Sequence, residues 1–181
     1  LALRQQDSTV TRTIPDDAGS ADAPVLIGIG VHIEPHGAVP SKLAGDLPPK
    51  RGRERADHNE PAFFKRQMED LRTLVGIVDR HKGKLTVQAQ TPFTKVATEA
   101  KETILSDLEK GGHEIALHFH EDAHLGRESE RQSAEVWTAV MKEEIEWIHK
   151  AGGTKIRYWS GGNLCPHVLE AASAAGLDVM G

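Results

Sequence analysis

Histidines and carboxylates gather at the end of one apolar segment of this 181-residue chain, which reads GHEIALHFHEDAH over residues 112–124. Side chains two apart on a β-strand point to the same face, so His118 and His120 project together while Leu117 and Phe119 face the opposite side. Two imidazoles that converge in this way suit a divalent metal ion. Zinc is the first choice, and cobalt and nickel accept the same ligands.

A second polar pair ends the first apolar run of the chain, which reads VLIGIGVHIEP over residues 25–35. The same alternation places His32 and Glu34 on one face. Glu34 supplies the carboxylate that the histidine pair lacks. A single histidine at a strand end is more simply explained as a hydrogen-bonded loop residue, so the metal hypothesis rests on the two pairs taken together.

The composition is that of one globular domain, with 38% hydrophobic residues, 27% charged residues and a net charge of −5. A mildly acidic chain with one short, interrupted basic run, KRGRER at 50–55, lacks the electrostatic surface that nucleic-acid binding requires. No apolar run approaches the roughly 18 residues of a membrane span, and no signal peptide is visible. We interpret the lone Cys165 as a packing residue.

The predicted organisation is a flexible tail or linker over residues 1–23, followed by a β/α domain over 24–181. Apolar residues at intervals of three and four, closed by glycines, predict helices, and apolar alternation between them predicts strands. The expected strands cover 25–31, 84–90, 114–120, 155–158 and 177–180, and the expected helices cover 61–81, 94–110, 133–150 and 166–175. Strands that alternate with helices predict a parallel α/β sheet, whose carboxyl edge should carry the functional groups, Glu34, His120 and Arg157 among them.

Two segments carry a resemblance to a known family: GHEIALH at 112–118 and RYWSG at 157–161. Over residues 24–181 the chain resembles the polysaccharide deacetylases with a NodB-homology domain, carbohydrate esterases of family four. The resemblance implies an irregular or incomplete (β/α) barrel of parallel strands, and a hydrolase that uses a divalent metal, most often zinc, to remove acetyl groups from a carbohydrate. It also implies an extracellular or cell-envelope location, and further barrel motifs that would follow residue 181.

The chain departs from the family pattern at the metal site itself. The Asp-Asp pair that normally ends the first strand is replaced by His32-Ile33-Glu34, and the second metal histidine, four residues after the first, is replaced by Asp122. The partner of His118 is therefore His120, Asp122 or His124, and strand geometry favours His120. Glu34 is either a metal ligand with His32 as the neighbouring base, or the base beside a site of His32, His118 and His120.

Further residues are expected to act around the centre, and the first of these roles comes from the resemblance. Arg157 would hold the catalytic carboxylate ionised and oriented. Tyr158 and Trp159 would provide a stacking wall for a sugar ring. Gln88 and Gln90, on one face of the second strand, would reach the substrate or the residues behind the metal. The long insertion over 36–60 leaves the end of the first strand and is placed to cover the site.

Two other classes of function fit the same residues. Metal-dependent phosphoesterases and amidohydrolases also carry a His-x-His pair at a strand end, but their pair belongs to the first strand, whereas His118 and His120 fall on the third. A barrel that binds carbohydrate without cleaving it is the second alternative. No motif distinguishes N-acetyl from O-acetyl substrates or indicates an oligomeric state.

Overall fold

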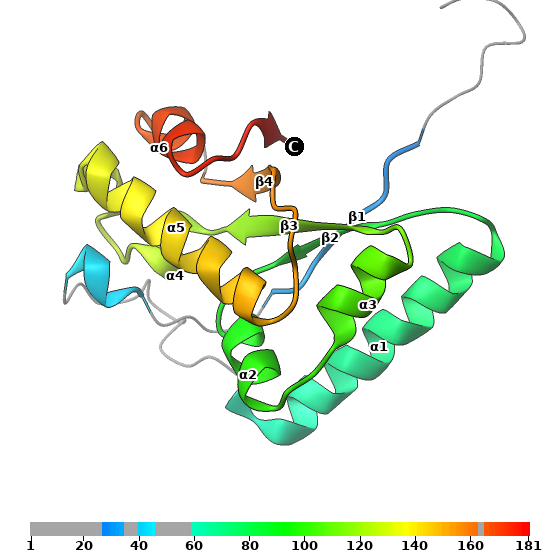
Figure 1. The fold of residues 1–181 in the computed structure, drawn as a ribbon. Coiled ribbons are helices and arrows are strands. Elements are labelled where there is room, and N and C mark those ends of the chain that lie inside the picture. The colour runs from blue at the N-terminus through cyan, green and yellow to red at the C-terminus, as the bar shows by residue number, and fades with distance from the viewer. Residues whose placement is uncertain (1–26, 35–39, 46–58, 163–164) are drawn as a thin grey trace, which may run out of the picture.

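The computed structural model of the chain describes residues 27–34, 40–45, 59–162 and 165–181. In these residues five parallel strands form one sheet in the order β1-β2-β3-β4-β5 (Figure 1). The strands are β1 (Gly30–His32), β2 (Thr86–Ala89), β3 (Glu114–Phe119), β4 (Tyr158–Gly161) and β5 (Val179–Met180). The predicted α/β class is confirmed. The tail predicted over residues 1–23 lies outside the described residues.

Helices connect the strands, as the alternation of patterns predicts. They are α1 (Pro61–Arg80), α2 (Phe93–Glu99), α3 (Ile104–Lys110), α4 (Glu121–His124), α5 (Ala134–Lys150) and α6 (Val168–Ala174), with short 3₁₀ turns η1 (Lys42–Ala44) and η3 (Ser129–Arg131). Pro61 occupies the first position of α1, where a missing N–H costs nothing. Ser133 caps α5, because its side chain accepts a hydrogen bond from the Val136 N–H. The short α4, directly after β3, was not predicted.

The single helix predicted over 94–110 is wrong, because the structure divides it into α2 and α3. Lys101 adopts a left-handed backbone with φ of 55° between the two helices, which interrupts the helical path. Buried apolar residues occur on both sides of the break, Ala97 before it and Leu105 after it. The apolar pattern therefore continues across the break and does not reveal it.

The predicted position of the fourth strand, 155–158, is also wrong, because β4 covers residues 158–161. Gly161, which lies beyond the predicted strand, pairs with Phe119 inside the sheet. A Cβ atom at Gly161 would lie 2.1 Å from the Phe119 carbonyl oxygen, and its φ is +103°. Only glycine permits this close approach of two backbones, so the strand runs through the glycine.

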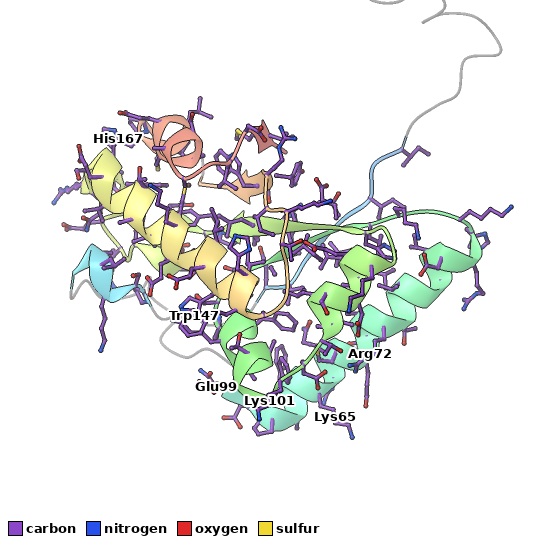
Figure 2. All side chains as sticks on the ribbon, in the orientation of Figure 1. Lys65, Arg72, Glu99, Lys101, Trp147 and His167 are labelled. Carbon is purple, nitrogen blue, oxygen red and sulfur yellow. The ribbon has the colours of Figure 1, made fainter. Side chains whose placement is uncertain are left out.

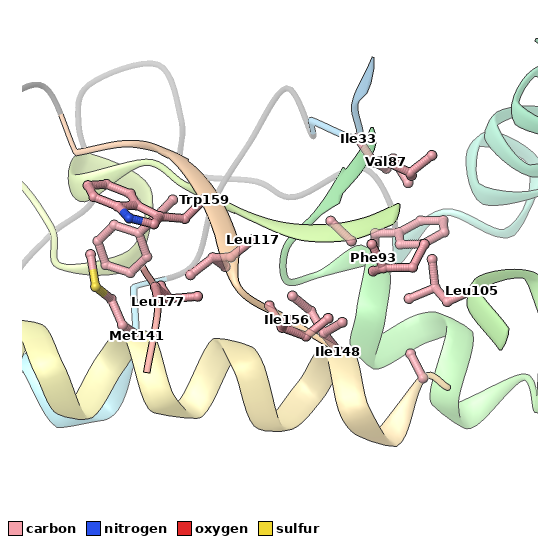
Figure 3. Close-up of a cluster of buried hydrophobic side chains, with 14 of the residues drawn as sticks. Ile33, Val87, Phe93, Leu105, Leu117, Met141, Ile148, Ile156, Trp159 and Leu177 are labelled. Atoms are coloured by element: carbon pink, nitrogen blue, oxygen red, sulfur yellow. The ribbon is translucent and has the colours of Figure 1, made fainter. Parts of the chain in front are cut away.

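The sheet has an apolar face that packs against helices. Alternate residues of the central strands, such as Val87, Leu117 and Trp159, are buried there. Figure 3 shows Trp159 on the same side of the cluster as Met141 of α5, and Phe93 beside Leu105, with Leu117 between these two groups. Figure 1 shows α1, α2, α3 and α5 along this side of the sheet. Burial of this face is the main source of stability for the fold.

The opposite face of the sheet is polar at its carboxyl end. His32 pairs in register with Gln88, and His118 pairs with Ser160. The alternation that buries Leu117 against the helices therefore turns His118 and its neighbours to the other face. Among the described residues β1 and β5 form the two edges, and they do not pair with each other. The consecutive strand order is that of successive β/α units in a barrel, but barrel closure stays a prediction.

Charged side chains cover the outer surfaces of the helices. Figure 2 labels Lys65 and Arg72 on α1, and Glu99 and Lys101 at the end of α2. Arg72 pairs with Glu102 at 3.1 Å. None of the described helices combines the length and apolarity needed to cross a membrane.

Candidate metal centre

Three histidines surround one carboxylate at the carboxyl edge of the sheet. Glu34 Oε1 lies 2.5 Å from His118 Nε2 and 2.7 Å from His120 Nε2. His32 Nδ1 lies 3.9 Å from the same oxygen. The two polar pairs that the sequence analysis singles out therefore meet at one point.

The sheet brings these residues together from strands that are not neighbours. β2 lies between β1 and β3, so the two pairs start from backbones about 10 Å apart, twice the spacing of adjacent strands. The side chains lean over β2 to close this distance. The rings of His32 and His118 stack with centroids 4.1 Å apart, and the ring of His120 meets that of His118 edge-on at 4.6 Å.

The ligand atoms of His32, Glu34 and His118 all lie within 4.8 Å of one another, so this group could hold a metal ion. Two imidazoles and one carboxylate are a ligand set of catalytic zinc sites, in which three protein ligands leave a position for water or substrate. The donor set therefore fits zinc. His120 lies beside the group, within hydrogen-bond distance of Glu34.

The protonation of the two central groups favours metal binding. Burial lowers the pKa of His118 to about 4, against the opposing effect of the neighbouring Glu34 carboxylate. His118 is therefore neutral at pH 7, which is the form that coordinates a metal. Partial burial by itself would raise the pKa of Glu34, but its interactions with His120 and His118 outweigh burial, and the pKa is lowered. Glu34 is an ionised carboxylate.

The two alternative ligands, Asp122 and His124, lie outside the group. His124 is buried on the helix side of the sheet, where its ring stacks on Phe119 at 4.6 Å. Its Nδ1 lies 2.7 Å from the His120 carbonyl oxygen, and its Nε2 lies 3.4 Å from Glu144. The hypothesis that His124 is a ligand is therefore wrong. Asp122 Oδ1 lies 4.0 Å from Nδ1 of His120.

Arg157 does not reach the centre, which corrects the orienting role predicted for it. The shift of β4 places Arg157 before the strand, at the amino edge of the sheet. Its exposed guanidinium pairs with Asp178, Nε lying 3.1 Å from both carboxylate oxygens. This partner raises the pKa of Arg157 and lowers that of Asp178.

Replacement of Arg157 by alanine is therefore expected to leave both metal content and turnover unchanged. The residue lies at the opposite edge of the sheet from Glu34, and an exposed ion pair adds little to stability. Metal analysis and a rate assay of Arg157→Ala beside the wild type test this. A large loss of turnover with unchanged metal content would restore the orienting role.

The predicted stacking wall is also wrong for Trp159. Its side chain is 2% exposed and packs in the core beside α5 (Figure 3), so it offers no surface to a sugar. Tyr158, two residues before Ser160 at the start of β4, is half-buried and lies toward the amino edge. Neither aromatic residue lies at the carboxyl edge.

The two glutamines of the second strand are buried and contact residues next to the site. Gln90 is 1% exposed, and its Nε2 lies 3.5 Å from the carbonyl oxygen of Ile33, the residue before Glu34. Gln90 therefore lies against the backbone that carries Glu34, and its predicted contact with a substrate stays a prediction. Gln88 is buried as well and contacts Ser160, a residue that the sequence analysis missed.

Part of the insertion over 36–60 lies near the carboxyl edge. In its described residues the Ser41 N–H donates to the His124 carbonyl oxygen at 2.8 Å, and Ala44 accepts a hydrogen bond from Gln132. This segment therefore packs beside α4 and α5. Most of the insertion lies outside the described residues, so its predicted role as a cover stays a prediction.

A cavity of about 500 Å³ lies at the amino edge of the sheet, far from Glu34. Three of its polar residues already have partners: His113 accepts the Leu85 N–H, Glu109 accepts from Thr154, and Arg157 pairs with Asp178. No set of donors converges on its centre. The histidine cluster is therefore the stronger candidate, although it lies on an open edge of the sheet.

Comparisons of the chain with models of protein families, with curated proteins and with solved structures give no match.

Proposed function

We propose that this chain is a metal-dependent hydrolase that removes acetyl groups from a carbohydrate. The observation that carries the proposal is the meeting of His32, His118 and His120 around the ionised Glu34 at the carboxyl edge of a parallel sheet. The choice of acetyl substrates rests on the resemblance of residues 112–118 to the polysaccharide deacetylases. The structure weakens the second element of that resemblance, RYWSG, because Arg157 lies at the other edge.

His32, Glu34 and His118 would hold the divalent ion, with zinc as the ion that their donor set suits best. When bound, such an ion polarises an acetyl carbonyl and lowers the pKa of water. Glu34 then serves as a ligand, which is the first of the two roles that the sequence leaves open.

His120 is the residue that we assign as the general base. It lies next to the metal group, its side chain is 26% exposed, and its Nε2 faces Glu34 at 2.7 Å. The negative charge of Glu34 stabilises the imidazolium that forms when His120 takes a proton from the attacking water. The new C–O bond forms at the acetyl carbon, the C–N or C–O bond to the sugar breaks, and the proton passes from His120 to the leaving amine or hydroxyl.

The accessibility of the cluster fits a polymeric or bulky substrate. The side chains of His32 and Glu34 are 44% and 43% exposed, whereas His118 is buried behind them. An acetyl group that projects from a sugar can therefore approach the cluster from the open edge of the sheet.

The test is acetate release from N-acetylated and O-acetylated oligosaccharides by the zinc-loaded chain, with p-nitrophenyl phosphate as the probe for a phosphoesterase. We expect acetate release that depends on zinc and is lost in His120→Ala, while that variant keeps its metal. Phosphate release without acetate release would favour the phosphoesterase. Zinc binding with neither product would refute the proposal and favour a barrel that only binds carbohydrate.

A further inference from the structure

A buried chain of polar side chains lies directly behind the candidate metal centre. His118 uses its second ring nitrogen, Nδ1, to contact Ser160 Oγ at 3.0 Å, and Ser160 in turn donates to Gln88 Oε1. All three side chains are buried, with Gln88 2% and Ser160 7% exposed. They come from three adjacent strands, because β2 and β4 flank β3.

The direction of the protons in this chain follows from what each atom can donate. A serine hydroxyl has one proton, and the carbonyl oxygen of Gln88 has none to give. Since Ser160 donates its proton to Gln88, it can only accept from His118. The proton of the neutral His118 ring therefore lies on Nδ1, and Nε2 carries a bare lone pair.

The bare Nε2 faces the ionised oxygen of Glu34 at 2.5 Å. In this tautomer Nε2 has no proton to donate to Glu34, so its lone pair is available to a cation that Glu34 also binds. The opposite tautomer would place the proton on Nε2, where it could bond to Glu34. The Ser160 hydroxyl would then face two acceptors, His118 Nδ1 and Gln88 Oε1, with a single proton to donate. The hydrogen bonds of Ser160 and Gln88 therefore disfavour the Nε2–H tautomer, which is the form that would suit a site without a metal ion.

We propose that Ser160 and Gln88 are positioning residues that fix the proton of His118 on Nδ1 and so present Nε2 to a divalent cation. The inference rests on the proposed metal centre and adds to it the residues that select the ligand tautomer. Groups behind a metal ligand that orient it in this way typically contribute about 10- to 100-fold to metal affinity.

The experiment measures the His118 tautomer and zinc affinity separately. Long-range ¹H–¹⁵N NMR of the chelator-treated chain identifies which ring nitrogen carries the proton, and competition with a chromophoric chelator gives the zinc dissociation constant. We expect the Nδ1–H form in the wild type. In Ser160→Ala we expect a shift to Nε2–H and zinc binding weaker by about 10-fold or more.

Three further variants separate positioning from folding. Ser160→Thr keeps the hydroxyl and should restore both readouts, and Gln88→Leu should reproduce the loss if Ser160→Ala does not fold. Thr86→Val is the matched control. This variant removes a hydrogen bond from Thr86 to Glu114 in the same sheet, and neither residue belongs to the chain of side chains behind His118. It should leave the tautomer and the affinity as in the wild type.

The two proposals fail in different ways. The positioning role would be overturned by a wild-type His118 that carries its proton on Nε2. It would also be overturned if Ser160→Ala kept the proton on Nδ1 and bound zinc with full affinity. Either result would count against it even if the chain binds zinc and releases acetate. An Nδ1–H ring that depends on Ser160 in a chain that releases no acetate would uphold the positioning role and refute the deacetylase alone.

Discussion

Replacement of His118 by alanine is expected to abolish stoichiometric metal binding. His118 is the buried member of the group, and its Nε2 lies closest to Glu34 of the three histidines. Its removal leaves His32 and Glu34, both exposed, and two exposed ligands do not hold a divalent ion against water and buffer. The measurement is metal content of the purified chain after incubation with zinc, by plasma mass spectrometry.

The same result is expected for Glu34→Ala, because Glu34 is the only carboxylate in the group. The matched control is His81→Ala, which removes an exposed imidazole at the end of α1. We expect one ion per chain in the wild type and in this control, and none in the two site variants. Full metal content in His118→Ala would show that the histidines at this edge are structural.

Replacement of Glu144 by alanine is expected to lower the free energy of unfolding by about 3–5 kcal/mol. Glu144 lies on α5 with its side chain 3% exposed. It accepts hydrogen bonds from the N–H and the hydroxyl of Thr91, both at 2.7 Å, and faces His124 at 3.4 Å. Burial opposes charge on both partners, but their attraction raises the pKa of His124 and lowers that of Glu144. The variant removes the acceptor of both Thr91 hydrogen bonds and the partner of the buried His124.

Urea denaturation of Glu144→Ala beside Glu146→Ala provides the measurement. Glu146 lies two residues further along α5, where it is 65% exposed and pairs with Lys150 at 2.9 Å. Its replacement should change stability by no more than about 0.5 kcal/mol. Equal stabilities of the two variants would show that the buried pair contributes nothing net.

The pair of Glu144 and His124 also connects the core to the candidate site. His124 holds the carbonyl oxygen of His120 at 2.7 Å, and α4 begins immediately after His120. Loss of Glu144 should therefore disturb the position of the proposed base as well as the packing of α5. We expect Glu144→Ala to release acetate more slowly than the wild type, measured under conditions in which the variant is still folded.

The sequence alone identified the two polar pairs that meet in the candidate metal centre. Strict alternation along two apolar runs is a local property, and it places His32 with Glu34 and His118 with His120 without knowledge of the rest of the fold. Alternation of strands and helices then predicts a parallel sheet, and with it a common carboxyl edge for both pairs. These inferences hold because each depends on neighbours in the chain.

The tertiary structure decided which side chains reach that edge. Local pattern does not fix the register between strands, and the register of β4 depends on the close approach of Gly161 to the Phe119 carbonyl group. That contact moves Arg157 to the amino edge and brings Ser160 behind His118. Likewise, His124 turns into the core because Glu144, twenty residues later, offers it a partner there. The local pattern leaves several residues equivalent as candidates for the site. Contacts between segments far apart in the sequence select among these residues, and such contacts exist only in the folded chain.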